Sequence, residues 1–236
     1  MSRGSFAERT KISMFAARRG ASSLIGRLNA HPLVRWRFAA ARSDRLLMAP
    51  QDLRTADPTR ASEIYAGRFA FAGKVVACDG RSPFEMEPPS AEWAEAMLGF
   101  GWLRHLRAAE SNITRANARA LVDEWISLQG AWNAIGWRPD VVARRIMSWL
   151  SQVPLVLHEA DARFYRRFIR SLTRQVRYLR RTLSNTRDGL PRLQTVIALT
   201  LASLCLEGQA RTLRAMTHRL TEELDRQVLP DGGHIS

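Results

Sequence analysis

The most clearly amphipathic stretch of the sequence is DARFYRRFIRSLTRQVRYLRRTLS, residues 161–184. Its arginines recur every three or four residues, a spacing that places them on one side of an α-helix. The arginine side comprises Arg163, Arg167, Arg170, Arg174, Arg177 and Arg181, and the apolar side comprises Phe164, Phe168, Leu172, Val176, Leu179 and Leu183. The stretch therefore predicts a long helix with its apolar side packed against a helical core.

Other helices are predicted on both sides of this one. Ser90 is a suitable N-cap, and the spacing of Trp93, Met97, Trp102 and Leu106 behind it fits an apolar stripe. Pro139 suits the first turn of a helix. We expect further helices over about 114–129, 139–150, 191–206 and 209–228. Because the connections are short, the sequence predicts an all-α fold of antiparallel helical hairpins.

The region before residue 90 differs in composition. Residues 49–61 are polar and contain two prolines, which predicts a linker. Residues 64–77 combine partial alternation, aromatic side chains and two glycines, which predicts a short β-hairpin. We therefore expect two parts, a basic amphipathic N-terminal segment with its linker over residues 1–60 and a helical domain over residues 61–236.

Charge is the outstanding compositional feature. The formal net charge is +14, and 34 of the 36 basic residues are arginines because Lys11 and Lys74 are the only lysines. Arginine pairs bidentately with carboxylate, sulfate or phosphate, so the excess suits an acidic glycan, a nucleic acid or an anionic membrane. Codon usage in a GC-rich genome explains a preference for arginine over lysine equally well. It does not remove the net charge.

The N-terminal region is the most basic part of the chain. Residues 1–60 contain 12 basic and 4 acidic side chains. This balance is compatible with peripheral membrane contact through residues 1–48, although a solvated helix packed on its own domain is the more common outcome. The sequence has no signal peptide and no run of about 20 apolar residues. We therefore expect a cytoplasmic or cell-envelope-associated protein.

Several side chains are candidates for a binding site. Trp132 and Trp137 are expected to be exposed near a helix connection, where aromatic rings can stack on sugars, although core packing explains most tryptophans equally well. Arg170, Arg174 and Arg177 are the candidate anion ligands, and the alternative is a solvated, salt-bridged face. The histidines at 31, 105, 158 and 218 and the two cysteines have no metal-ligand spacing, so neither a metal nor a cofactor is expected.

Short motifs resemble those of a known family. They are FAG at 71–73, GFGWLRHL at 99–106, WL at 149–150 and, above all, LDRQVLPDGGH at 224–234. With these motifs the sequence resembles the heparinase II/III-like proteins of alphaproteobacteria from about residue 60 onward, over roughly the first half of such a protein. The resemblance implies an incomplete α/α toroid, with a C-terminal β-sandwich domain as its partner in the full-length protein.

The resemblance also implies β-elimination on an acidic polysaccharide that contains uronic acid. His234 lies on a glycine loop behind a helix and would neutralise the substrate carboxylate. The family's catalytic tyrosine normally follows this motif, and none does here, so this chain is expected to be inactive alone. An incomplete toroid would leave apolar helix faces uncovered, which predicts self-association.

Two alternatives to the lyase remain. One is a non-catalytic helical module that binds an anionic polymer or a membrane surface. The other is nucleic-acid binding, which rests on charge alone and ranks last because the sequence carries no recognised nucleic-acid motif.

Overall fold

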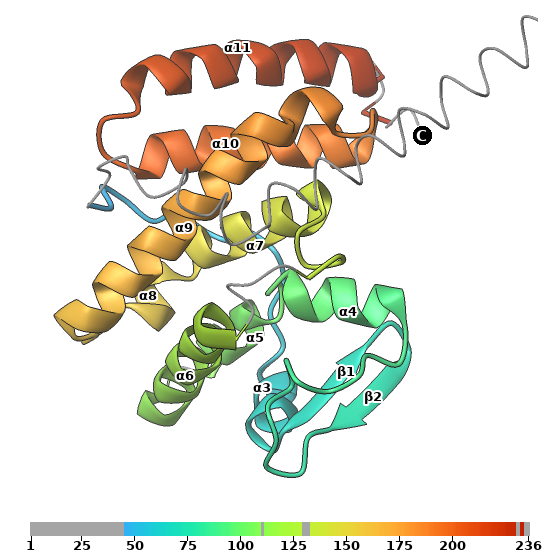
Figure 1. The fold of residues 1–236 in the computed structure, drawn as a ribbon, viewed down its shortest axis with the longest axis vertical. Helices are drawn as coiled ribbons and strands as arrows, with labels where there is room; N and C mark the ends of the chain where they lie inside the picture. The colour runs from blue at the N-terminus through green and yellow to red at the C-terminus, as the bar shows by residue number, and fades with distance from the viewer. Residues whose placement is uncertain (1–44, 110, 129–132, 230–231, 234–236) are drawn as a thin grey trace, which may run out of the picture.

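A computed structural model of the chain describes residues 45–109, 111–128, 133–229 and 232–233. The fold is mostly helical with one small antiparallel sheet. The helices α10 (Leu190–Cys205) and α11 (Ala210–Gln227) lie at one end of the molecule (Figure 1). The sheet and α3 (Pro58–Tyr65) lie at the other end, with α7 (Pro139–Ser151) and α9 (Ala162–Thr182) between them.

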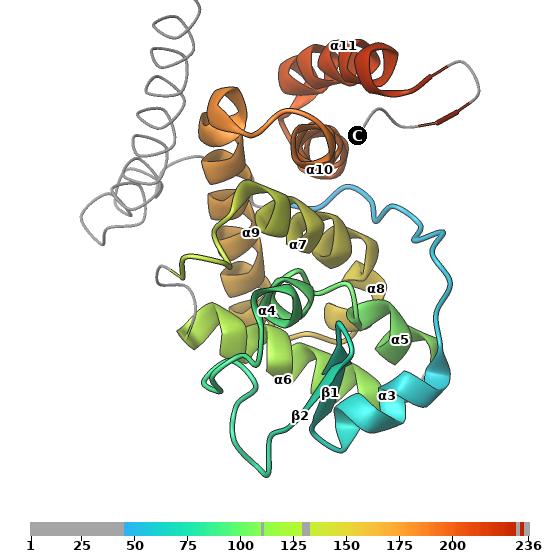
Figure 2. The same cartoon turned by 90° about the vertical axis from the view of Figure 1, so that its right-hand side faces the viewer.

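The described chain begins beside α10 and then crosses to the sheet. Leu46 forms an isolated bridge with Leu206, and the backbone N–H of Leu47 donates to the carbonyl of Cys205 at 2.8 Å. The chain next passes the C-terminal end of α7, where Gln152 donates to Asp52 at 3.0 Å, and reaches α3 (Figure 2). Residues 1–48, for which peripheral membrane contact is predicted, lie almost entirely outside the described residues.

The end of the predicted linker is a helix. Asp57 caps α3 by accepting from the backbone N–H of Thr59 at 2.9 Å, and Pro58 occupies the first turn. The β-hairpin is confirmed with a later start, since β1 (Arg68–Phe71) pairs with β2 (Lys74–Ala77) and residues 64–65 belong to α3. The expected boundary between residues 60 and 61 falls inside α3.

The predicted apolar stripe behind Ser90 is divided between two helices. Ser90 caps α4 (Ala91–Leu98) as expected, and α5 (Leu103–Ala108) follows after a turn. Phe100 has a φ of 57°, a left-handed conformation that ends α4. Its side chain is fully buried, so core packing holds the backbone in this conformation.

The remaining helices follow the predicted order. They are α6 (Asn112–Leu128), α7 with Pro139 in its first turn, the short α8 (Val153–Val156), and α9 with Asp161 as its N-cap. A 3₁₀ turn, η2 (Leu183–Asn185), leads from α9 to α10 and α11. The predicted helical hairpins are confirmed for α10 and α11, while the ring of an α/α toroid is not established by this arrangement.

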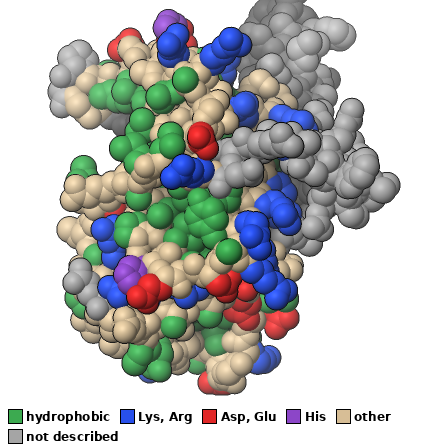
Figure 3. All heavy atoms as spheres, turned by 90° about the vertical axis from the view of Figure 1, so that its left-hand side faces the viewer, with side chains coloured by type: hydrophobic (Ala, Val, Ile, Leu, Met, Phe, Trp, Pro, Cys, Tyr) green, Lys and Arg blue, Asp and Glu red, His purple; other side chains and the backbone are tan. Residues whose placement is uncertain are grey.

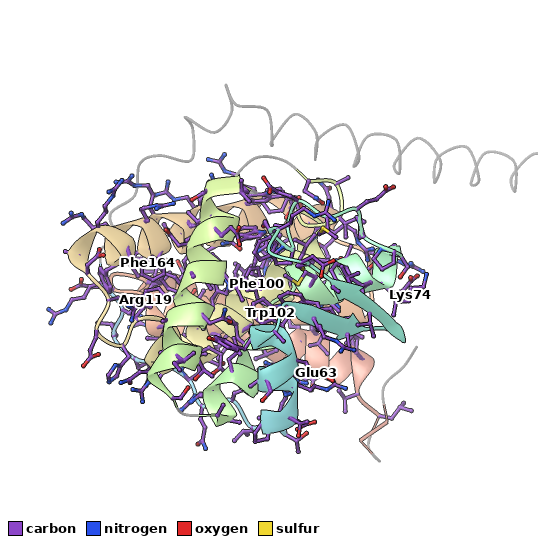
Figure 4. All side chains as sticks on the ribbon, turned by 90° about the horizontal axis from the view of Figure 1, so that it is seen from below. Glu63, Lys74, Phe100, Trp102, Arg119 and Phe164 are labelled. Carbon is purple, nitrogen blue, oxygen red and sulfur yellow. The ribbon has the colours of Figure 1, made fainter. Side chains whose placement is uncertain are left out.

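The core is rich in aromatic side chains. Phe100 stacks on Trp102 with a centroid distance of 5.2 Å and meets Trp149 edge-on at 5.6 Å. Trp149 in turn meets Trp125 edge-on at 5.4 Å and stacks on Phe168 of α9 at 5.0 Å. Phe100 and Trp102 lie in the middle of the molecule (Figure 4). This packing fixes α9 by its apolar side and so determines the direction of its arginines.

Candidate binding surface

The arginines of α9 form the strongest candidate site in the described chain. The apolar side predicted for this helix is confirmed, because all six of its members are buried. The outer side carries seven arginines within about 100° of helix circumference. We call this set the α9 arginine surface; its exposed members are Arg163, Arg166, Arg170 and Arg181, and its half-buried members are Arg167, Arg174 and Arg177. Basic side chains gather on one side of the face drawn in Figure 3.

Among the described residues, acidic partners cover little of the N-terminal half of this surface. Arg167 forms an ion pair with Asp123 of α6 at 2.9 Å and also donates to the hydroxyl of Ser127 at 2.6 Å. Within the described part of the chain, Arg163, Arg166 and Arg170 form no ion pair. Because like charges three or four residues apart repel by about 0.2–0.5 kcal/mol per pair, the exposed end of the surface favours an anionic ligand.

The other end of the surface is partly buried against aromatic side chains. The guanidinium of Arg174 lies 5.4 Å from the ring centroid of Trp137. Burial lowers the pKa of Arg177, and the neighbouring charges of Arg181 and Arg180 lower it further. An anion bound beside Arg177 would offset both effects.

The structure changes the expectation for the tryptophans. Trp137 is 7% exposed, so the prediction that it is an exposed platform is wrong. Its ring meets Tyr178 edge-on at 5.0 Å, and its carbonyl accepts from the Tyr178 hydroxyl at 2.6 Å. Core packing therefore determines the position of Trp137. This is the alternative to a sugar-stacking platform that the sequence analysis gives for tryptophans. Trp132 and His234 lie outside the described residues.

Of the predicted ligands, the structure places Arg170, Arg174 and Arg177 together on one surface. Trp137 lies beneath that surface, in contact with Arg174.

Sequence reasoning missed a buried arginine beneath this surface. Arg145 is fully buried and donates to Gln175 Oε1 at 2.7 Å and to the carbonyls of Leu98 at 2.8 Å and Gly136 at 3.0 Å. Its guanidinium also lies 4.2 Å from the ring centroid of Trp125. Burial, together with Arg174, lowers its pKa to about 9, so it stays charged at neutral pH. Because its donors are occupied by the protein, Arg145 is a structural side chain.

The other possible chemistry in the described chain is limited. No group of three or more His, Cys, Asp or Glu side chains among the described residues could hold a metal ion. Both cysteines, Cys78 and Cys205, are buried free thiols. In the described part of the chain, no helix has the length and apolar character needed to cross a membrane. The arrangement therefore defines a helical module whose clearest functional feature is a cationic surface.

Comparison with known proteins finds a relative that is named for its localisation with FtsZ. No family model matches the chain, and no solved structure matches it. The chain is 31% identical over 206 residues to FtsZ-localized protein C of Caulobacter vibrioides (strain NA1000 / CB15N). The alignment covers 86% of this chain and 35% of that protein, so the chain spans about a third of the length of the relative it matches.

This match corrects the expected family. The assignment to the heparinase II/III-like lyases is wrong, because the extended similarity is to a protein named for its localisation with FtsZ. The β-elimination activity, the uronate-containing polysaccharide, the catalytic role of His234 and the β-sandwich partner rested on that assignment and are withdrawn with it. The alternative of a non-catalytic helical module agrees better with the match.

Proposed function

We propose that this chain is a non-catalytic helical module that acts in bacterial cell division and localises with FtsZ. The observation that carries the proposal is the similarity to FtsZ-localized protein C over 86% of the chain. The α9 arginine surface supports it, because a module that binds a larger assembly needs an exposed recognition surface. We further propose that this surface contacts an acidic region of a division protein or of a polymer that such proteins form.

Arginine is well suited to this contact. Its planar guanidinium pairs bidentately with carboxylates and is more weakly hydrated than an ammonium group. The exposed side chains of Arg163, Arg166 and Arg170 lie on successive turns, so they can follow an acidic partner along the helix. Charges at the rim of an interface mainly set the association rate and its salt dependence. Binding should therefore weaken as salt is raised.

The test is co-sedimentation of the full chain with FtsZ polymers at increasing salt. The chain in which Arg163, Arg166 and Arg170 are all replaced by Glu should bind at least about tenfold more weakly at low salt. The matched control replaces Arg60, Arg68 and Arg81 by Glu. These three arginines are also exposed, and they form no ion pair in the described chain. The control has the same net charge and should bind like the unmodified chain.

The outcomes separate the two parts of the proposal. Absence of co-sedimentation by the unmodified chain, together with diffuse localisation of a fluorescent fusion in cells that contain an FtsZ ring, would exclude the association with FtsZ. Equal losses in both triple variants would show that net charge, rather than the α9 arginine surface, carries the binding. Flotation with anionic vesicles that is unaffected by either triple variant would instead locate a membrane contact outside this surface.

A further inference from the structure

The antiparallel pair α10–α11 has two flanks of opposite character. Thr200 Oγ1 of α10 lies 3.4 Å from the carbonyl oxygen of Met216, and Arg192 Nε lies 2.7 Å from Glu223 of α11. These two contacts fix the register of the pair. Glu223 also pairs with Arg226 at 3.4 Å, so one flank of the helix pair is ionic on both helices.

The opposite flank is apolar on both helices. On α10 the residues at 190, 197, 201 and 204 share one side by helical spacing, on α11 the residues at 213, 220 and 224 do so, and Val228 follows directly at the C-cap of α11. Each set lies on the side of its helix away from the ionic flank, so the two sets form one continuous face. We call it the hairpin apolar face: Leu190, Ile197, Leu201 and Leu204 with Leu213, Leu220, Leu224 and Val228.

Much of this face is open to solvent, while Leu201 and Leu220 are partly buried against the core. Leu190 is 52% exposed, Leu204 41% and Leu224 40%, and the remaining members are partly exposed. Single exposed leucines are ordinary on protein surfaces, but a contiguous set along two helices is typical of a surface that binds a partner. α10 and α11 lie at the edge of the molecule, where a second molecule can approach (Figures 1 and 2).

The pattern of the face is symmetric about its centre. On α10, Leu190 and Leu204 each lie seven residues from Ile197. On α11, Leu213 and Leu224 lie equally far from the peptide bond between residues 218 and 219. The register set by the Thr200–Met216 and Arg192–Glu223 contacts places Ile197 level with residues 218–219. A single twofold axis at this level, lying in the face and perpendicular to both helices, would therefore pair α10 with α10 and α11 with α11 of a second copy.

Two charges at the rim lie close to the same symmetry. Arg214 and Asp225 are exposed on the outer side of α11, and neither forms an ion pair within the described part of the chain. In an antiparallel pairing of two α11 helices about this axis, Arg214 of one copy lies two residues, about 3 Å along the helix, from the level of Asp225 of the other, within reach of its long side chain, and the pair occurs twice. A self-complementary surface of this kind is the requirement for a twofold, isologous interface.

We infer that the hairpin apolar face is the contact between two copies of this chain in a twofold dimer. In it Leu190 packs on Leu204 of the other copy, Leu213 packs on Leu224, and the two Ile197 side chains meet at the axis. Two helices about 24 Å long and about 10 Å wide offer about 500 Å² per copy. The total of about 1,000 Å² is at the lower end for specific interfaces, so the dimer should dissociate at concentrations on the order of micromolar.

Sedimentation equilibrium of the full chain tests the contact. The unmodified chain should dimerise reversibly with concentration, and Leu204→Glu or Leu224→Glu should weaken dimerisation at least tenfold. Both positions are already exposed, so the variants should keep the helical circular-dichroism spectrum of the unmodified chain. The matched control is Leu53→Glu, because Leu53 is 86% exposed and lies outside the face. The control should dimerise like the unmodified chain.

A charge exchange tests the register. Arg214→Asp or Asp225→Arg alone should weaken the dimer, and the double variant should restore it because each pair is re-formed with its signs reversed. Dimers that persist in the Leu204→Glu and Leu224→Glu variants, or a double variant weaker than both single ones, would overturn the inference. So would an unmodified chain that stays monomeric at every concentration up to about 1 mM, well above the micromolar range expected for dissociation.

Discussion

Arg145 and Arg144 are adjacent arginines in α7 with different physical roles. Replacing Arg145 with Met should lower the free energy of unfolding by about 3 kcal/mol or more, because Gln175 and two buried carbonyls lose their donors. Replacing Arg144 with Met should cost less than about 1 kcal/mol, since its ion pairs with Glu95 and Asp140 are partly solvated. Urea unfolding of the two variants measures the difference. Equal losses would contradict a structural role specific to Arg145.

The burial of Arg145 could have been predicted from its position. It lies four residues after Val141 and four before Trp149, both fully buried, so helical spacing places it on the inner side of α7. Arginine is frequent in this chain, and a charged side chain is normally expected on the surface, so a buried arginine is not distinguished from the others. The identity of its partners could not be predicted, because Leu98 and Gly136 come from distant segments that only the fold brings together.

His105 should make stability depend on pH. Its Nδ1 accepts from the backbone N–H of Asp57 at 3.0 Å, which requires the neutral ring, and burial followed by Arg104 lowers its pKa to about 4 from 6.5. The unfolded chain therefore binds the proton more readily than the folded one. Stability should be complete above about pH 6.5 and fall as the pH drops toward 4, by at most about 3 kcal/mol.

The measurement is the free energy of unfolding at pH 7 and at pH 4.5. His105→Asn keeps an acceptor at the Nδ1 position and should reduce this pH dependence. His218→Asn is the control, because the side chain of His218 is 77% exposed and pairs only with Glu222 on the same helix. It should retain the pH dependence. If the two variants behave alike, His105 is not the responsible group.

At the scale of elements, the N-cap of α9 is a clear target. The Asp161 carboxylate accepts from the backbone N–H of Phe164 at 2.7 Å, and this contact together with the fields of nearby arginines lowers the pKa of Asp161. Asp161→Ala should lower the free energy of unfolding, because the first turn of α9 loses this capping hydrogen bond. Asp161→Asn retains a side-chain acceptor and should cost less. Thermal unfolding compares them, and an equal loss would mean that the cap hydrogen bond contributes little.

Helix ends were the best-predicted local features. Ser90, Pro139 and Asp161 carry signals that act within one turn, so the sequence alone locates the starts of α4, α7 and α9. Asp57 and Pro58 give the same signal for α3, but beside other polar residues they were interpreted as linker. The break at Phe100 could not be predicted, because its left-handed backbone is held by packing against Trp102 and Trp149.

At the scale of the molecule, the sequence predicts a helical fold with a cationic helix, whereas the resemblance of its short motifs leads to the wrong family. The error came from LDRQVLPDGGH at residues 224–234. Much of that motif serves local structure, because α11 ends at Gln227 and the backbone N–H groups of Leu229 and Gly232 bond to the carbonyls of Gly233 and Leu229. Helix ends and glycine turns of this kind recur in unrelated proteins, so they are weak indicators of a shared reaction.

The two proposed surfaces should reinforce each other. A dimer formed through the hairpin apolar face carries two α9 arginine surfaces, and a repetitive polymer can engage both at once. The second contact is then intramolecular, which raises the apparent affinity without any new interaction. Leu204→Glu should therefore bind FtsZ polymers about 10- to 100-fold more weakly than the unmodified chain, although its arginines are unchanged.

Concentration provides the internal control for this prediction. Well below the dimer dissociation constant, the unmodified chain is monomeric and should bind with the affinity of Leu204→Glu. Leu53→Glu should follow the unmodified chain at every concentration, because Leu53 lies outside the hairpin apolar face. Co-sedimentation across this range measures both limits. If Leu204→Glu binds as tightly as the unmodified chain where the latter is dimeric, the two surfaces act independently, and dimerisation serves some purpose other than polymer binding.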